Sequence, residues 1–375
     1  MANKLVPEVR IDGFREEWVN YKWRETVNMS TNMVDPKSGQ YDSIMHVGPG
    51  NIESHSGRLY SNVKTVKEDN LISGKFHFSA GDILYGKINP QLAKFNLAVF
   101  EGLASADTYV LNAKNGISQL YLYTIIQTSD FYKYSVSVSR RTGMPKINRD
   151  ELNQYTYNGP KDFKEQQKIG EFFKQLDDRI ALQQRHVEQL KQSKQGFLQK
   201  MFPKNGESVP EVRFEEFSQH WELKCLGDLC VITTGKLDAN AMVENGDYDF
   251  YTSGIKKYKI DVPAFEGPAI TVAGNGATAG YMHLADGLFN AYQRTYVLTN
   301  FLANREFLYQ VIGNELPRTI NQEARKGNIP YIVMNMLTNL KIFIPKNEEQ
   351  QKIGEFFKQL DDLIAKNERE LELLQ

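Results

Sequence analysis

The sequence predicts an α+β fold built twice, in which each of two globular mixed α/β domains is followed by a long helix. The main observation is an internal repeat, because the fourteen residues 165–178 return unchanged as residues 349–362. A second repeat lies earlier in each half, where Val-Pro-Glu-Val-Arg at residues 6–10 recurs at residues 209–213. Repeats of this length do not arise by chance, so one fold is present in two copies with different inserts.

Length and composition fit two packed domains. The chain has 375 residues, of which 41% are hydrophobic and 11% aromatic, which is enough for two cores and disfavours disorder. Lys and Arg number 45 against 46 Asp and Glu, so the formal net charge is −1. This balance excludes a uniformly basic nucleic-acid coat but permits local basic patches.

The sequence offers few signals for disulfides, metals or targeting. The two cysteines, Cys225 and Cys230, have no further partners, and no two histidines are spaced three or four residues apart. A disulfide framework and a structural zinc site are therefore disfavoured, and both thiols are expected to be buried. Residues 1–7 contain no apolar core of signal-peptide length, and no run of eighteen apolar residues occurs. We expect a soluble cytoplasmic protein without a metal site.

The repeats divide the chain into four predicted parts. These are, in order, a domain at residues 1–160, a helical spacer at 161–203, a domain at 204–346 and a helix at 347–375. The domains carry the front repeats, residues 5–18 and 208–221, which end in Trp18 and Trp221. Similarity inside the domains is thin, although Thr-Tyr-Val-Leu occurs once in each. The two domains are therefore expected to share a fold and to differ in surface.

The repeated segments after each domain are predicted to be long helices that form a coiled coil. Apolar residues recur there at alternating steps of four and three, a spacing typical of a coiled-coil seam. The predicted seam consists of Ile169, Phe173, Leu176, Ile180, Gln183, Val187 and Leu190 in the first helix and of Ile353, Phe357, Leu360, Ile364, Asn367 and Leu371 in the second. Gln183 and Asn367 occupy the same position, where a polar residue lowers stability but fixes register. Packing of each helix within its own domain is the alternative to this coiled coil.

The sequence also predicts where the two helices start. Asp162 with Glu165, and Asn347 with Gln350, have the capping-box pattern of helix starts.

Motifs that resemble enzyme sites are incomplete. Residues 81–87 match the phosphate loop G-x-x-x-x-G-K, but Ile88 replaces the required Ser or Thr and the interior is typical of a strand. Residues 274–280 resemble a dinucleotide loop without a following helix. Residues 89–92 share only their first half with the Asn-Pro-Pro-aromatic motif of amino-group methyltransferases. We expect no catalytic residue in this chain.

Polar and basic residues at corresponding places in the two halves are the candidates for nucleic-acid contacts. Residues 131–149 contain five basic side chains and no glutamate or aspartate, and a turn signal places several of them on a loop. The candidates are Lys87, Asn89, Lys133, Arg140, Arg141, Lys146 and Arg149 in the first half and Asn275, Thr278, Gln293, Arg294, Arg318, Arg325 and Lys326 in the second. Arg and Lys would contact phosphates, and Asn, Gln and Arg could contact base edges. A solvated charged loop is the alternative for each stretch.

These features together resemble the specificity subunits of Type I restriction-modification systems over essentially the whole chain. The resemblance rests on the two front repeats, on the two Glu-Gln-Gln-Lys-Ile-Gly-x-Phe-Phe helices and on the stretch at residues 81–87. The duplicated helix motif is the specific part, and the stretch at residues 81–87 supports it. One departure is that the second helical repeat stops at Gln375, before the position that corresponds to Met201.

The resemblance implies a division of labour between this chain and its partners. Each insert would be a target recognition domain for one half of a split, asymmetric site in double-stranded DNA. The helices would pair antiparallel, set the spacer between the half-sites and dock two modification subunits, which carry an adenine methyltransferase and its S-adenosylmethionine. Restriction subunits would carry the ATP- and Mg-dependent translocase and the nuclease, so this chain would need no cofactor. A two-headed protein scaffold without sequence-specific DNA binding is the alternative.

Overall fold

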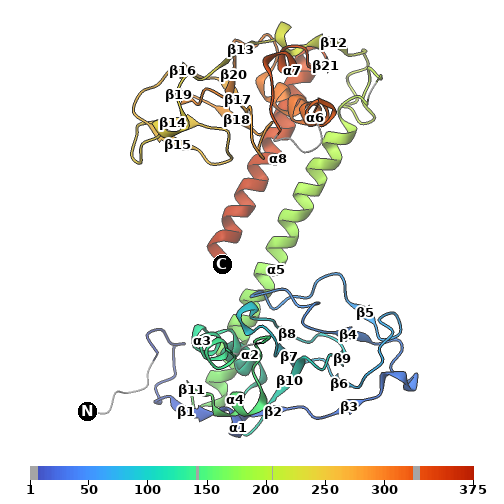
Figure 1. The fold of residues 1–375 in the computed structure, drawn as a ribbon, viewed down its shortest axis with the longest axis vertical. Helices are drawn as coiled ribbons and strands as arrows, with labels where there is room; N and C mark the ends of the chain where they lie inside the picture. Colours follow the sequence, from blue (N-terminus) through green and yellow to red (C-terminus); the bar gives the residue numbers. More distant parts are fainter. Residues whose placement is uncertain (1–6, 141–142, 205, 324–329) are drawn as a thin grey trace. The chain divides into compact units, whose positions relative to one another are not determined.

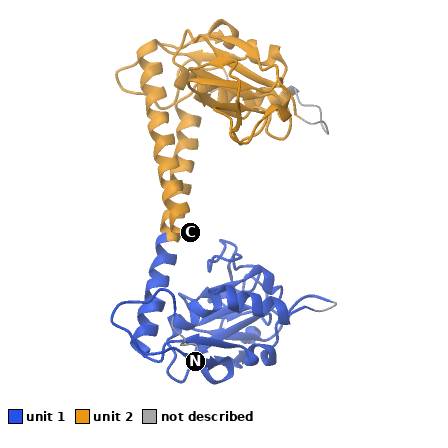
Figure 2. Ribbon diagram, turned by 90° about the vertical axis from the view of Figure 1, so that its left-hand side faces the viewer, with its two compact units in different colours: residues 1–179 blue, residues 180–375 orange. Residues whose placement is uncertain are grey.

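The computed structural model describes residues 7–140, 143–204, 206–323 and 330–375 (Figure 1). Contacts divide the chain into two compact units, Met1–Arg179 and Ile180–Gln375 (Figure 2). The long helix α5, Phe163–Lys200, contributes to both units. We call them unit 1 and unit 2 and describe each by itself.

Unit 1 contains three small sheets and four helices before α5. The strands are β1 (Val19–Lys22) with β11 (Thr156–Gly159); β2 (Val27–Met29), β10 (Thr108–Ala113), β7 (Ile83–Gly86) and β8 (Phe95–Leu97), in that order; and β3 (Met33–Val34), β6 (Lys75–Phe78), β9 (Gly102–Ala104), β4 (Met45–Val47) and β5 (Lys64–Thr65), in that order. The helices are α1 (Trp23–Thr26), α2 (Gln119–Gln127), α3 (Ser129–Val138) and α4 (Arg149–Gln154), with the 3-10 turns η1 (Pro36–Ser38) and η2 (Pro90–Leu92).

Unit 2 repeats the two-stranded and the four-stranded sheet of unit 1, and its third sheet has four described strands where that of unit 1 has five. Its strands are β12 (Glu222–Cys225) with β21 (Lys341–Ile344); β13 (Val231–Thr234), β20 (Thr295–Thr299), β17 (Ala269–Ala273) and β18 (Met282–Ala285); and β15 (Tyr258–Ile260), β14 (Tyr248–Tyr251), β19 (Leu288–Ala291) and β16 (Phe265–Glu266). Its helices are α6 (Arg305–Glu323), α7 (Met334–Thr338) and α8 (Asn347–Leu374), with the turns η3 (Leu226–Asp228) and η4 (Ala239–Ala241). The only parallel pairings among the described strands are β4 with β9 and β14 with β19, which occupy equivalent places.

The fold class predicted from the repeat is therefore confirmed. The shared Thr-Tyr-Val-Leu segments lie in β10 and β20, the buried second strands of the two four-stranded sheets. Residues 83–86 form the buried strand β7, as the apolar interior of the phosphate-loop-like motif predicts. Residues 274–280 are followed by strand β18 and not by the helix that a dinucleotide site requires.

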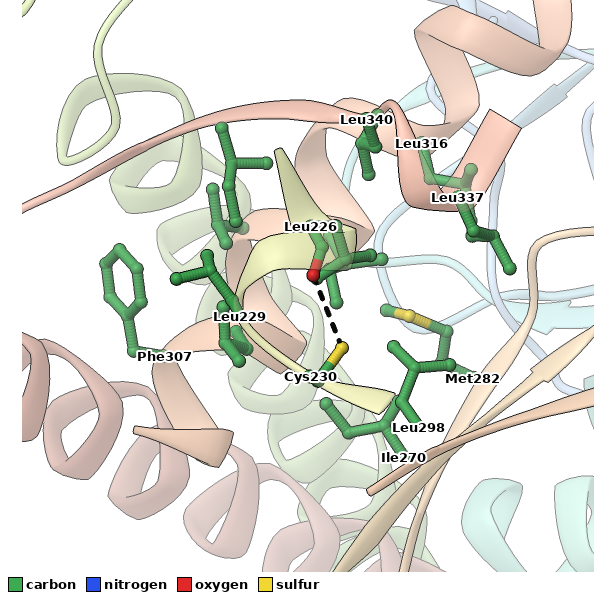
Figure 3. Close-up of a cluster of buried hydrophobic side chains, with 14 of the residues drawn as sticks. Leu226, Leu229, Cys230, Ile270, Met282, Leu298, Phe307, Leu316, Leu337 and Leu340 are labelled. Carbon is green, nitrogen blue, oxygen red and sulfur yellow. Dashed lines mark hydrogen bonds between the residues drawn. The ribbon is translucent and has the colours of Figure 1, made fainter. Parts of the chain in front are cut away.

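Each unit has its own aromatic-rich core. In unit 1, Trp23 stacks on Phe131 with ring centroids 5.3 Å apart. In unit 2, Leu226 of η3 packs among side chains from the four-stranded sheet, α6 and α7 (Figure 3). The Cys230 thiol in this core donates a hydrogen bond to the Leu226 carbonyl at 3.5 Å, and burial raises its pKa to about 12, so it stays protonated near neutral pH. Cys230 is buried as expected, whereas Cys225 is partly exposed.

Two equivalent ion pairs fasten the front segments to the helices that follow the domains. Arg10 donates from Nε and Nη2 to the two carboxylate oxygens of Glu165, both at 2.7 Å. Arg213 makes the same bidentate contact with Glu349, again at 2.7 Å for both bonds. Both carboxylates are almost fully buried. In each unit the same buried, bidentate ion pair thus joins the front repeat to the repeated helix.

The next residue of each repeat holds the helix against the start of another helix in the same unit. Gln166 Oε1 accepts from the Ser118 backbone N–H at 2.9 Å, and Gln350 Oε1 accepts from the Asn304 backbone N–H at 2.9 Å. The side-chain N–H groups of both glutamines donate to a carbonyl just before their own helix, at 2.9 and 2.7 Å. These buried amides therefore satisfy backbone groups that would otherwise lack partners.

The predicted capping boxes are wrong, although both helices start within two residues of the expected position. Asp162 caps α5 by accepting from the Lys164 backbone N–H at 2.8 Å. Glu165 does not complete the box, because its carboxylate binds Arg10 instead. At α8 the N-cap is Lys346, without a side-chain cap, and Gln350 makes the contacts described above.

Residues 180–200 of α5 pair antiparallel with α8 inside unit 2 (Figures 1 and 2). Gln183 Nε2 donates to Asn367 Oδ1 at 2.9 Å, and further along α5 Lys194 Nζ lies 2.5 Å from Asp361 Oδ1. Gln183 thus pairs with its own repeat counterpart, the relation expected at a local two-fold axis between the helices. The antiparallel coiled coil is confirmed, with Val187, Ile364 and Asn367 buried in it.

The seam in unit 1 departs from the prediction. Ile169 packs against the core of unit 1, while Phe173 is 42% exposed and so does not lie in a closed seam there. α5 begins as a helix of unit 1, and its later part, residues 180–200, pairs with α8 in unit 2. None of the described helices is both long and apolar enough to cross a membrane.

Candidate nucleic-acid interface

Two loops of unit 1 that are distant in the sequence meet beyond the end of β7. The Asn89 backbone N–H donates to the Pro145 carbonyl at 2.7 Å, and the Ile147 N–H donates to the Lys87 carbonyl at 2.9 Å. A bridge between Ile88 and Lys146 lies between these bonds. The structure therefore brings together three of the predicted residues, Lys87, Asn89 and Lys146.

Lys87 and Arg149 both lie near the ring of Tyr109, but their charged groups have different partners. The Lys87 ammonium lies 5.9 Å from the ring centroid and 3.7 Å from Asp107 Oδ1. The Arg149 guanidinium donates to the Met29 carbonyl at 2.9 Å and to the Ser30 carbonyl at 2.6 Å. Because two of its five donors bind these carbonyls, we assign Arg149 to positioning the end of β2.

The remaining basic candidates of unit 1 face solvent. Lys133 is exposed on α3, Arg140 is exposed just after this helix, and Lys146 is exposed on the loop that joins residues 87–89. Among the residues that the structure describes, none forms an ion pair with these three. They are therefore free to bind an anion. Arg141 lies outside the described residues.

Unit 2 builds an equivalent loop pair. The Ile332 N–H donates to the Gly274 carbonyl at 2.7 Å, and the Gly276 N–H donates to the Pro330 carbonyl at 3.1 Å. The Gly274 N–H donates to the Arg294 carbonyl at 2.8 Å, as the Lys87 N–H donates to the Asp107 carbonyl at 3.0 Å in unit 1. A Cβ at Gly274 would lie 2.3 Å from the Arg294 carbonyl oxygen, so this approach requires glycine.

The side chains of the predicted residues in unit 2 have different roles. Arg294 is exposed, and none of the described residues forms an ion pair with it. Gln293 is also exposed and donates to Asp238 Oδ1 at 2.8 Å. Asn275 Oδ1 accepts from the Ser253 hydroxyl at 2.6 Å, and the Thr278 hydroxyl donates to the Ser253 carbonyl. Asn275 and Thr278 therefore anchor a neighbouring loop, and the Asn275 amide group remains available as a donor.

The other three candidates of unit 2 receive less support. Arg318 lies on α6, with Nη1 at 3.3 Å from Glu315 Oε2, so its charge is partly balanced within the helix. Arg325 and Lys326 lie outside the described residues.

Sequence reasoning missed the loop that Asn275 and Thr278 anchor. This loop joins β14 to β15 and presents the exposed Lys256 and Lys257. His283 Nε2 lies 3.4 Å from the Gly254 carbonyl in the same loop, and burial lowers the pKa of this histidine. The Lys-Lys pair between two strand-like segments was the available signal.

Unit 1 holds its corresponding loop in the same way. Asn96 Nδ2 on β8 donates to the Gly57 carbonyl at 2.7 Å, as His283 on β18 contacts Gly254 in unit 2. The loop between β4 and β5 carries the exposed His55 and the partly buried Arg58. Each unit thus presents one loop from the four-stranded sheet, a second loop just before α4 or α7 that pairs with it, and one loop from the second sheet.

Comparison with known proteins now identifies the family. The model of the family "Type I restriction modification DNA specificity domain" matches residues 16–192 and again residues 218–375. The chain belongs to this family. The two matches follow the internal repeat, so the chain contains two DNA specificity domains of the Type I restriction-modification type.

Relatives with this domain include specificity subunits from bacteria and archaea. The chain is 38% identical over 148 residues to the specificity subunit of the Type I restriction enzyme EcoDI from Escherichia coli, a match that covers 40% of this chain and 32% of the relative. It is 22% identical over 334 residues to the MjaVIII specificity subunit from Methanocaldococcus jannaschii, which covers 79% of this chain and 73% of the relative. The chain thus spans only about a third of the length of the bacterial relative.

Solved structures share the fold. The S subunit of a Type I restriction-modification system from M. genitalium superposes with a TM-score of 0.72 at 14% identity, covering 99% of this chain and 95% of that chain. A chain from a study of complex assembly and conformational transition in the Type I R-M system gives a TM-score of 0.52 at 16% identity, covering 98% and 94%. At these identities the likeness concerns the fold alone.

Proposed function

We propose that this chain is the DNA-recognition subunit of a Type I restriction-modification complex and that each unit recognises one half of a bipartite site. The observation that carries the proposal is the pair of loops that both units assemble on equivalent backbone hydrogen bonds. The loops share geometry but present different side chains, with Lys87, Asn89 and Lys146 in one unit and Asn275, Gln293 and Arg294 in the other. Two different surfaces on one fold suit two different half-sites.

The side chains of these loops match the chemistry of a DNA groove. The exposed ammonium and guanidinium groups would neutralise phosphates, which supplies affinity without sequence information. At the same loops, guanidinium groups would donate to base edges and amide groups would both donate and accept, which supplies specificity. Catalysis would belong to partner subunits that carry S-adenosylmethionine, ATP and Mg.

The repeated helices support the proposal that two modification subunits dock on this chain. The fourteen identical residues include Gln167, Glu171 and Gln175, whose counterparts are also glutamine, glutamate and glutamine, and all six side chains are exposed. Burial cannot explain identity at exposed positions between halves that have otherwise diverged. Two identical surfaces suit two copies of one partner.

Exchange of one insert tests this function. We would replace residues 19–160 with the corresponding insert of another specificity subunit, co-express the chimaera with its modification subunits and sequence the methylome. One half of the methylated site is expected to change, while the other half and the spacer stay the same. The matched control exchanges residues 222–340 and is expected to change the opposite half. Change in both halves, or in neither, would contradict modular recognition.

A further inference from the structure

The same buried contacts hold the paired loops of both units. The Tyr109 hydroxyl of unit 1 donates to the Ile147 carbonyl at 3.2 Å, and the Tyr296 hydroxyl of unit 2 donates to the Ile332 carbonyl at 2.8 Å. Both tyrosines belong to the shared Thr-Tyr-Val-Leu segment. Together with the backbone hydrogen bonds between the loops, these contacts establish which residues of the two loop pairs are equivalent.

One pair of side chains lies at the centre of each loop pair. Isolated bridges join Ile88 to Lys146 in unit 1 and Asn275 to Tyr331 in unit 2. In both units the two backbone hydrogen bonds between the loops flank the bridged residues. This is the non-hydrogen-bonded arrangement of an antiparallel pair, in which opposite side chains are closest. Asn275 and Tyr331 are therefore immediate neighbours, and Tyr331 has the position in unit 2 that Lys146 has in unit 1.

The second loop of unit 2 presents apolar groups where that of unit 1 presents polar ones. Unit 1 carries Lys146 and Asn148 along this loop. Unit 2 carries Tyr331 and Val333 at the equivalent positions, and these are 63% and 42% exposed. Residues that alternate along an extended segment face the same way. Unit 2 thus exposes an aromatic ring and an aliphatic side chain next to the Asn275 amide.

The contacts of Asn275 orient its amide and leave donors for a ligand. Its Oδ1 accepts from the Ser253 hydroxyl at 2.6 Å, which fixes the orientation of the group. Within the described ranges nothing accepts a hydrogen bond from its Nδ2. Both hydrogens of Nδ2 and the second lone pair of Oδ1 are therefore available to one ligand edge.

We propose that Asn275 and Tyr331 read one adenine–thymine pair in the half-site of unit 2. The Asn275 amide binds N6 and N7 of the adenine, and the Tyr331 ring covers the 5-methyl group of the thymine. An amide on adenine and an apolar group on the thymine methyl are complementary to the major-groove edge of this base pair. The inference deepens the proposed function and rests on it, because it names the bases that one unit recognises and a residue, Tyr331, that reads them.

Removal of single methyl groups from the DNA tests the ring contact. The site would be determined from the methylome of cells that carry this chain and its modification subunits, and each thymine of the half-site of unit 2 would be replaced by deoxyuridine. The wild-type complex should bind one of these DNAs about fourfold more weakly, the effect of one buried methyl group. Tyr331→Ala should bind this DNA and the thymine DNA equally, whereas Tyr331→Phe keeps the ring and should discriminate as the wild type does.

The adenine opposite that thymine tests the amide contact. Replacement of this adenine by 7-deazaadenine removes N7 and should weaken binding of the wild-type complex about fivefold or more. Asn275→Ala also loses the contact with Ser253, so it should bind both DNAs more weakly than the wild type. It should, however, show no further loss with 7-deazaadenine. This comparison separates the base contact from the effect of Asn275 on its own loop.

Lys146→Ala is the matched control, because it changes the equivalent position of unit 1. It should preserve the difference between thymine and deoxyuridine in the half-site of unit 2 and should reduce the dependence of binding on salt. Tyr331→Ala should leave the salt dependence unchanged, because the tyrosine releases no counterions. Tyr331 is 63% exposed, so its variants are expected to fold, as circular dichroism would show.

Three results would overturn the inference. These are a half-site of unit 2 in which no thymine methyl affects binding by the wild type, equal discrimination by wild type and Tyr331→Ala, and a reduced salt slope for Tyr331→Ala, which would make this residue a phosphate contact. Failure of the insert exchange would refute the proposed function itself. A successful exchange combined with any of these three results would refute the reading of this base pair alone.

Discussion

Asp177 and Asp361 occupy equivalent residues of the repeat and differ in charge environment. Burial raises the pKa of Asp177, whereas Lys194 neutralises Asp361 at 2.5 Å. A raised pKa in the folded state means that Asp177 favours folding below the unfolded value near 3.8 and loses that contribution as pH rises through the folded value. Its negative charge at neutral pH therefore opposes folding of unit 1.

The same substitution at the two residues should have opposite effects on stability. Asp177→Asn should raise the melting temperature at pH 7, and the gain should vanish as pH falls toward 3.8. Asp361→Asn removes a partly exposed ion pair and should destabilise unit 2 by about 0.5–1 kcal/mol. Calorimetry of both variants between pH 4 and pH 7 measures this. Destabilisation by Asp177→Asn at neutral pH would contradict the assigned environment.

Lys146 and Arg149 are close in sequence and should respond differently to removal. Lys146→Ala should weaken DNA binding uniformly across sequences and reduce the slope of log K against log salt by about 1, because one phosphate contact is lost. Arg149→Ala should lower the stability of unit 1 instead, since two backbone carbonyls lose their donors. Salt titrations combined with thermal melts separate the two roles. An unchanged salt slope for Lys146→Ala would remove this residue from the interface.

Residue roles were predictable only where the residue type itself carries the signal. Lys87, Asn89 and Lys146 stood out by chemistry, although nothing in the sequence indicated that they meet. The role of Arg149 was hidden because its partners are the Met29 and Ser30 carbonyls, and every residue has a carbonyl. Long-range contacts to backbone atoms leave no trace in the pattern of side chains.

At the scale of elements, the repeated glycine marks a close approach between two helices. A Cβ at Gly170 would lie 2.5 Å from Leu120 Cβ and 2.6 Å from its backbone carbon. At the counterpart Gly354 a Cβ would lie 3.0 Å from the Phe307 backbone nitrogen. In each unit the repeated helix thus packs directly on the start of α2 or α6.

Gly170→Ala should therefore destabilise unit 1 in spite of the better helix propensity of alanine. That propensity favours alanine by about 1 kcal/mol, while overpacking against backbone costs about 1–3 kcal/mol or more. Gly196→Ala is the matched control, because a Cβ there meets nothing within 4 Å, and it should stabilise the helix. Chemical denaturation of both variants measures the difference. Stabilisation by Gly170→Ala would contradict the close approach.

Helix extents were predictable from periodicity, but the contacts at helix starts were not. The periodicity predicted a coiled coil and the family resemblance implied that its helices pair antiparallel, whereas the direct contact of Gln183 with Asn367 was not predicted. The capping boxes failed because an ion pair with Arg10, 155 residues earlier, outcompetes a local cap for the Glu165 carboxylate. A bidentate, buried ion pair is stronger than a cap, and sequence spacing alone does not reveal it.

At the scale of the whole molecule, the proposed function predicts that the length of α5, which contributes to both units, sets the spacer of the DNA site. A seven-residue insertion preserves the seam, because it adds one full heptad. It would be placed between Gln183 and Val187 in α5 and between Ile364 and Asn367 in α8, so that the Gln183–Asn367 and Lys194–Asp361 contacts both survive.

This paired insertion should lengthen the spacer without changing either half-site. Seven helical residues add about 10 Å, which is close to three base pairs of B-DNA. A four-residue insertion in α5 alone is the control, and it should abolish methylation because it breaks the pairing of the seam. Methylome sequencing of cells with the modification subunits would show the spacer. Altered half-site sequences, or an unchanged spacer with full methylation, would show that the helices do not set the separation of the half-sites.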